Sequence, residues 1–133
     1  MKELIEKIKT ARFIWVCGNG GSAATAEHLA NDLFSKGIKV ICLSSNTSIM
    51  TMIANDFGYP HVFSRQLDTL ANDEDLLITI SCSGTSRNIV SAINIAREMR
   101  MDTYQFEVFN NNKNYGALED KHIQLVHQIK KAL

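Results

Sequence analysis

Apolar runs and stretches of periodic apolar positions alternate along the chain, and their order predicts the fold. Runs rich in Val, Ile and Leu are typical of buried strands, and apolar positions three and four residues apart are typical of helices. Strands are expected over residues 12–17, 38–43, 75–80 and 103–109, and helices over 2–9, 22–36, 47–55, 60–70, 85–100 and 116–131. This order predicts an α/β fold, in which a doubly wound, flavodoxin-like parallel sheet of four to five strands is flanked by helices.

The length of the chain favours one domain. Its 133 residues are enough for one buried core and too few for two domains of ordinary size, so residues 1–133 are treated as a single domain. Gly37 is expected to end the first long helix. A small sheet leaves an open edge, which we expect another subunit or the terminal helices to cover.

Charge and cysteine usage exclude several classes of protein. Lys and Arg together number 14, as do Asp and Glu, and no basic stripe favours nucleic-acid binding. No run is long enough to span a membrane, and the charged first ten residues differ from a signal peptide, so a cytoplasmic protein is expected. Cys17 and Cys42 end predicted strands and are interpreted as small buried residues.

Two loops rich in glycine and hydroxyl groups carry the candidate chemistry. Gly18–Ser22 and Ser81–Ser86 each follow a predicted strand and precede a predicted helix. Glycines let the backbone approach an anion, hydroxyls donate hydrogen bonds to it, and helix N–H groups point at it. Taken alone, Ser22 or Ser86 is equally typical of a helix N-cap, but two such loops at the ends of parallel strands favour a phosphate-ester site.

The two loops lack the signatures of the common nucleotide sites. Neither is a Walker A motif or a Gly-x-Gly-x-x-Gly fingerprint, which disfavours a nucleoside triphosphate or a dinucleotide. Cys82 lies within the second loop, where we expect it to lend its backbone N–H. A nucleophilic Cys82 thiol is the alternative, although no His adjoins it in the sequence.

Several segments match one known family in order. They are Cys-Gly-Asn-Gly-Gly-Ser-Ala at 17–23, Ala-Glu-His-Leu-Ala-Asn-Asp-Leu at 26–33, Ala-Asn-Asp-Phe-Gly-Tyr at 54–59, Val-Phe-Ser-Arg at 62–65, Ile-Ser-Cys-Ser-Gly-Thr-Ser-Arg-Asn-Ile at 80–89 and His-Ile-Gln-Leu-Val-His at 122–127. With these segments the chain resembles the sugar isomerase (SIS) domain family, and within it the phosphoheptose isomerases. That family converts sedoheptulose 7-phosphate to a heptose phosphate, moving a proton between C1 and C2 through an enediol.

The resemblance assigns roles to residues of the two loops. It implies that the phosphate and sugar are bound by Asn19, Gly21, Ser22, Asp56, Ser81, Cys82, Ser83, Thr85 and Ser86, with Asn19 and Asp56 near the sugar hydroxyls. For Asp56, a local Asx turn in Asn-Asp-Phe-Gly is the alternative.

The resemblance also implies a divalent metal, expected to be zinc, on His28, Asp32, Glu119 and His127, with Asp32 and His127 as the acid–base pair. Spacing agrees in part, because His28 and Asp32 are four residues apart on one helix face, where a simple ion pair is the alternative. Glu119 and His127 differ by a net rotation of about 80° and can address a common site. His122 faces elsewhere and is interpreted as a structural residue.

The chain departs from the family pattern in four respects. Asp32 stands where the family has Glu, which sets its carboxylate back by about 1.5 Å. Glu119 replaces a Gln and adds negative charge beside any metal. The segment between Phe109 and Glu119 is too short for the family's fifth strand, and the helix before the first strand is short.

Two hypotheses follow from different classes of protein. The first is a sugar-phosphate aldose–ketose isomerase, and the second is a non-catalytic SIS module that binds a sugar phosphate or scaffolds a partner such as a replication initiator. The retained His28, Asp32 and His127 favour the enzyme, and the departures favour the module. A homo-oligomer, either a dimer or a tetramer, is expected from the family's habit of building sites between subunits.

Overall fold

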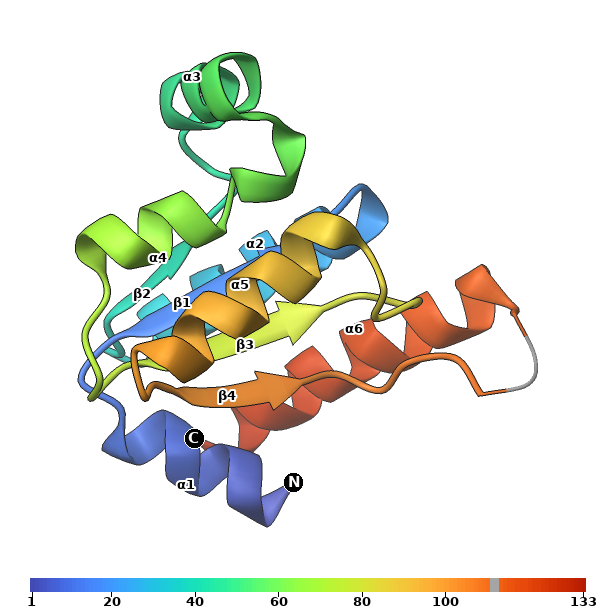
Figure 1. The fold of residues 1–133 in the computed structure, drawn as a ribbon. Coiled ribbons are helices and arrows are strands. Elements are labelled where there is room, and N and C mark those ends of the chain that lie inside the picture. Colours follow the sequence, from blue (N-terminus) through green and yellow to red (C-terminus); the bar gives the residue numbers. More distant parts are fainter. Residues whose placement is uncertain (111–112) are drawn as a thin grey trace.

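The computed structural model describes residues 1–110 and 113–133, which form a single parallel sheet with helices on both faces (Figure 1). The sheet has four strands in the order β2-β1-β3-β4. The elements in chain order are α1 (Lys2–Thr10), β1 (Ile14–Gly18), α2 (Gly21–Phe34), β2 (Val40–Cys42), α3 (Thr47–Phe57), η1 (Tyr59–His61), α4 (Ser64–Leu70), β3 (Leu76–Ile80), α5 (Arg87–Glu98), β4 (Asp102–Gln105) and α6 (Tyr115–Ala132). The predicted doubly wound α/β fold is therefore confirmed.

The alternation of side chains along the central strands divides the core into two layers. Ile14 and Val16 of β1 face a layer built with α1, α2 and α6, whereas Trp15 and Cys17 face a layer built with α3, α4 and α5. Figure 1 shows α5 and α4 in front of the sheet and α2 and α6 behind it. Cys17 and Cys42 are buried, as the sequence predicts. No helix of the described residues is apolar over a length that would cross a membrane.

Two expected elements differ from those observed. The stretch over 60–70 is not one helix, because a 3-10 turn with Pro60 in its first positions precedes a separate helix from Ser64. The strand expected over 103–109 ends at Gln105, after which the Phe109 N–H donates to the Cys82 carbonyl at 2.8 Å. The chain after β4 therefore joins the loop that follows β3 instead of continuing the sheet.

Candidate functional site

The first predicted loop and the second predicted loop leave the sheet at paired positions. Gly18, the last residue of β1, lies opposite Ile80, the last residue of β3. A Cβ atom on Gly18 would lie 2.5 Å from the Ser22 carbonyl oxygen and 2.9 Å from that of Ile80, so only glycine fits there. Since β1 is followed by its neighbour on one side and β3 by its neighbour on the other, this is the switch point at which α/β sheets bind ligands.

The serine hydroxyls at the two helix starts are not used as N-caps. Gly20, at φ 57°, is the N-cap of α2, and no side chain caps that helix. Ser86 is the N-cap of α5 by position, but its side chain makes no capping hydrogen bond. The alternative that Ser22 and Ser86 are ordinary caps is therefore wrong, and both hydroxyls remain free of that role.

Internal hydrogen bonds shape the second loop. Ser81 Oγ accepts from the Gly84 N–H at 3.1 Å, and Ser83 Oγ accepts from the Thr85 N–H at 3.2 Å. Because each hydroxyl acts as the acceptor in these bonds, its own proton is left to donate to an anion. Gly84 adopts φ 66°, the left-handed conformation that this sharp loop requires.

A network of amides holds Asn19 beside the loops. Asn19 and Asn88 exchange two side-chain hydrogen bonds of 2.9 and 2.8 Å, and the Tyr59 hydroxyl donates to Asn19 Oδ1 at 3.1 Å. Asn88 is buried, and neither it nor Tyr59 was among the predicted site residues. The position of Asn88, two residues after Ser86 in a matched segment, was the available signal.

Asp56 lies apart from this network. It is exposed near the end of α3, where the Asn55 amide donates to its Oδ1 at 2.9 Å. This contact is local, as in the alternative interpretation of Asp56, and a role for Asp56 beside a sugar stays a prediction.

A second cluster forms where α2 packs against α6. The rings of His28 and His127 lie 5.3 Å apart between centroids. The Asp32 side chain is only 2% exposed, and its Oδ2 lies 3.4 Å from His28 Nε2. Its Oδ1 accepts from the Lys130 ammonium at 2.6 Å. The structure thus brings three of the four predicted metal ligands into one neighbourhood, together with a lysine that was not predicted.

The charge state of Asp32 follows from these neighbours. Burial favours the neutral form and raises the pKa of the carboxyl, but the hydrogen bond and charge of Lys130, with the charges of His28 and His127, outweigh burial and lower the pKa overall. Asp32 is therefore ionised at neutral pH. The spacing of Lys130 three residues after His127 places it on the same face of α6, but nothing local in the sequence identifies Asp32 as its partner.

Glu119 lies beside the loops rather than beside Asp32. A Cβ atom on Gly21 would lie 2.9 Å from Glu119 Oε1, so the carboxylate rests against the start of α2. Burial raises the pKa of the Cys82 thiol and the Glu119 charge raises it further, whereas a hydrogen bond with the Ser22 side chain lowers it. The first loop, the second loop and α6 therefore meet at this point.

The predicted zinc ligands do not form a metal site in this arrangement. Within residues 1–110 and 113–133, no group of three His, Cys, Asp or Glu side chains is placed to hold a metal ion. The reason is visible in two contacts: Asp32 binds the Lys130 ammonium, and Glu119 rests against Gly21. In this arrangement the residues present do not fit a zinc ion. Zinc binding stays a prediction that rests on the family resemblance alone.

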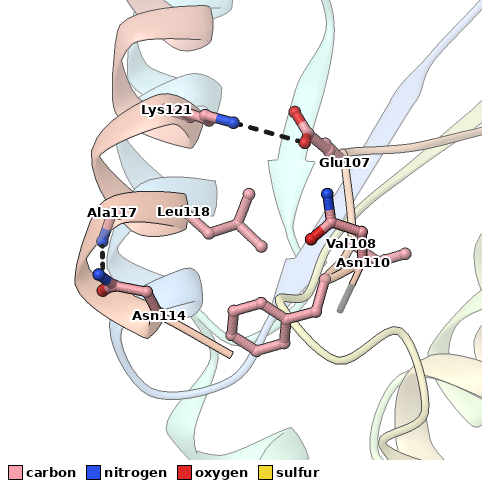
Figure 2. Close-up of a pocket in the computed structure, with 8 residues that line it drawn as sticks. Glu107, Val108, Asn110, Asn114, Ala117, Leu118 and Lys121 are labelled. Carbon is pink, nitrogen blue, oxygen red and sulfur yellow. Dashed lines mark hydrogen bonds and ion pairs between the residues drawn. The ribbon is translucent and has the colours of Figure 1, made fainter. Parts of the chain in front are cut away.

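His122 has the structural role that its position on α6 predicts. It is buried, its Nε2 lies 2.7 Å from the Glu107 carbonyl oxygen, and its ring packs edge-on against Phe106. A hollow of about 270 Å³ lies nearby between α6 and the segment after β4, where Lys121 and Glu107 form an ion pair of 3.6 Å (Figure 2). None of the predicted site residues lines this hollow.

Comparison with known proteins agrees with this geometry. Residues 2–106 match the SIS domain family. The chain belongs to the SIS domain family. It is 46% identical over 106 residues to a phosphoheptose isomerase of Helicobacter pylori (strain P12), an alignment that covers 75% of this chain and 55% of that protein. It is 44% identical over 108 residues to the phosphoheptose isomerase of Aliarcobacter butzleri, covering 77% of this chain and 57% of that protein.

Solved structures extend the comparison to α6, which lies beyond the family match. A phosphoheptose isomerase structure from Neisseria gonorrhoeae superposes with a TM-score of 0.90 at 28% identity, covering 98% of this SIS chain and 80% of that chain. One from Francisella tularensis has a TM-score of 0.88 at 23% identity, covering 98% and 82%, and shows the shared fold. The chain spans about half the length of the curated relatives that it matches.

Proposed function

We propose that this SIS chain is a sugar-phosphate aldose–ketose isomerase, acting on sedoheptulose 7-phosphate through an enediol. The observation that carries the proposal is the meeting of the two hydroxyl-rich loops at the ends of β1 and β3. The phosphoheptose isomerases among the relatives support the choice of substrate.

The phosphate of the substrate belongs, in this proposal, at the two loops. Ser22, Ser81, Ser83 and Ser86 supply hydroxyl donors, and the start of α5 supplies N–H groups. The Asn19 amide, held by Asn88, then faces the sugar hydroxyls.

The proton transfer belongs to the cluster between α2 and α6. A base removes a proton from C1 of the ketose while the C2 carbonyl oxygen is protonated, which gives the enediol. The enediol then takes a proton at C2 and loses one from O1, which gives the aldose. Asp32 and His127 form the acid–base pair: His127 is exposed to a substrate, and Asp32 is held in its ionised form beside it.

Turnover and isotope exchange test the catalytic part of the proposal. The wild-type protein should isomerise sedoheptulose 7-phosphate and exchange solvent deuterium into it, and His127→Ala should lose both by about a hundredfold or more. His61→Ala, at an exposed histidine of η1, is the matched control and should retain activity. Absence of turnover and exchange in a wild-type protein that still binds the sugar phosphate would favour the binding-module hypothesis instead.

Calorimetry tests the phosphate site separately. Ser83→Asp places a carboxylate beside the bound phosphate and should abolish binding of sedoheptulose 7-phosphate. Ser48→Asp, at an exposed position of α3, adds the same charge elsewhere and should leave the affinity unchanged. Equal affinities in Ser83→Asp and wild type would place the phosphate elsewhere.

The proposal includes the assembly and the location of the protein. A homo-oligomer is supported by large apolar side chains on the surface, among them Phe34 at 75% and Tyr59 at 55% exposure. A cytoplasmic location is supported by three free cysteines, since secreted domains of this size usually pair theirs.

A further inference from the structure

The Asp32 carboxylate already has a cationic partner. Lys130 Nζ lies 2.6 Å from Oδ1, a short, charge-assisted contact. The other oxygen, Oδ2, is buried, has no hydrogen-bond partner, and has His28 Nε2 3.4 Å away. A carboxylate that is 2% exposed requires a compensating charge, and Lys130 supplies it.

The placement of Lys130 follows from the packing of α6. Val126 and Ile129 of α6 are buried against the core, and Lys130 sits beside them, three residues after His127 on the face that meets α2. Its side chain is 45% exposed, so the stem runs over the surface while the ammonium reaches the buried carboxylate. Lys131, the next residue, is exposed and lies about 100° further around the helix.

We propose that the Lys130 ammonium is a built-in cation that takes the position beside Asp32 and excludes divalent metal ions from the His28, Asp32 and His127 cluster. A zinc ion bound by a carboxylate oxygen lies about 2.0–2.2 Å from it. It cannot share Oδ1 with an ammonium held there without forcing two cations together. Lysine has no lone pair when protonated and so cannot join a metal's ligands instead.

Zinc titration by calorimetry tests this exclusion without any need for turnover. Lys130→Met keeps the length of the stem, removes the charge, and should bind zinc about tenfold or more tightly than wild type. Lys131→Met is the matched control and should bind as wild type does. Asp32→Asn in the Lys130→Met background should remove the gain, because the freed carboxylate is the added ligand.

The outcome that overturns the proposal is equal zinc affinity in wild type and Lys130→Met, whether both bind tightly or neither binds. Should Lys130→Met fold poorly, because it leaves Asp32 unpaired, Lys130→Gln keeps a donor, and the zinc-induced rise in its melting temperature gives the same comparison. One further consequence rests on the proposed isomerase function: chelators should leave wild-type turnover unchanged. Loss of turnover with chelator would contradict metal exclusion, whereas absence of turnover altogether would contradict the isomerase and leave the zinc comparison intact.

Discussion

The Cys82 thiol shows how neighbouring groups set the chemistry of one residue in the candidate site. Cys82 is buried, and burial and the Glu119 carboxylate both raise its pKa. A thiol reacts as its thiolate, so native Cys82 should react slowly with a disulfide reagent at neutral pH. This environment disfavours the alternative of a nucleophilic thiol.

Glu119→Gln tests that explanation. It keeps the shape of the side chain and removes the charge, so the pKa of Cys82 should fall and labelling should become several times faster. Glu107→Gln, at an exposed glutamate, is the control and should label at the wild-type rate, and Cys82→Ser identifies the reacting thiol. A rate unchanged by Glu119→Gln would mean that access, rather than charge, limits the reaction.

Asp32 should make folding stability depend on pH in acid. Its pKa is lowered in the folded protein, so the stabilisation by Lys130 is fully present above the pKa of an unfolded Asp. It is lost as the pH falls from about 4 through the lower pKa of the folded state. The difference in unfolding free energy between wild type and Asp32→Asn, measured by urea denaturation, should therefore narrow in that range. A constant difference from neutral pH to pH 3 would show that the ion pair contributes nothing to stability.

Local spacing in the sequence predicts which residues of one helix lie close together, but it does not predict contacts between residues that are far apart in the chain. The interval of four between His28 and Asp32 predicts their proximity, which the structure shows. Lys130 was missed because a lysine in the last turn of a helix ordinarily interacts with the helix dipole and solvent. Its partner lies 98 positions away in the chain, where no local pattern can point.

At the level of elements, Gly84 sets the conformation of the loop between β3 and α5. Its φ is 66°, and a Cβ atom there would lie 2.8 Å from Val108 Cγ1 in the segment after β4. Gly84→Ala should therefore strain the loop in two ways, through the positive φ and through the contact with Val108. It should lower stability by about 1–2 kcal/mol and weaken phosphate binding. Gly37→Ala is the control, since Gly37 also has a positive φ, of 77°, but its Cβ would meet no atom within 4 Å.

The two glycine variants separate backbone strain from crowding. Equal losses of stability, measured by thermal or urea unfolding, would assign the whole effect to the positive φ. A larger loss in Gly84→Ala, together with weaker phosphate binding, would show that the contact with Val108 fixes the loop.

The elements that periodicity predicted well are those whose pattern reflects burial on the sheet. All five residues of β1 and of β3 are buried, and both strands were predicted within two residues of their observed ends. β4 has exposed ends and only half-buried central residues. The apolar run therefore does not indicate where the strand stops pairing with its neighbour. The break before Ser64 depends on a 3-10 turn that apolar spacing does not register.

At the scale of the whole molecule, the order of the strands determines which loops lie next to each other. The order β2-β1-β3-β4 brings the loops after β1 and β3 together, and that meeting was predictable from the fold class alone. The fold class does not predict the positions of the residues assigned to zinc. In the structure, α6 places Glu119 at the loops and Lys130 at Asp32. Helix register of this kind is set by tertiary packing, which one sequence does not reveal.

The surface around α3 supports the prediction of a homo-oligomer. α3 lies away from the sheet (Figure 1) and buries only Ile53. Around it Met52, Phe57, Tyr59 and Leu70 are each about half exposed, and Arg65 lies 3.5 Å from the centre of the Phe57 ring. So many large apolar side chains on one side of a small fold are typical of a surface that another subunit covers.

Sedimentation of the purified chain at micromolar concentration should accordingly show at least a dimer. Met52→Lys combined with Leu70→Lys places two charges in this surface and should shift the protein toward monomer, because burying them unpaired is unfavourable. Val90→Lys, an exposed apolar position on α5, changes charge outside this surface and should sediment as wild type does. A wild-type protein that stays monomeric at every concentration tested would contradict the prediction and would also exclude any site completed by a second chain.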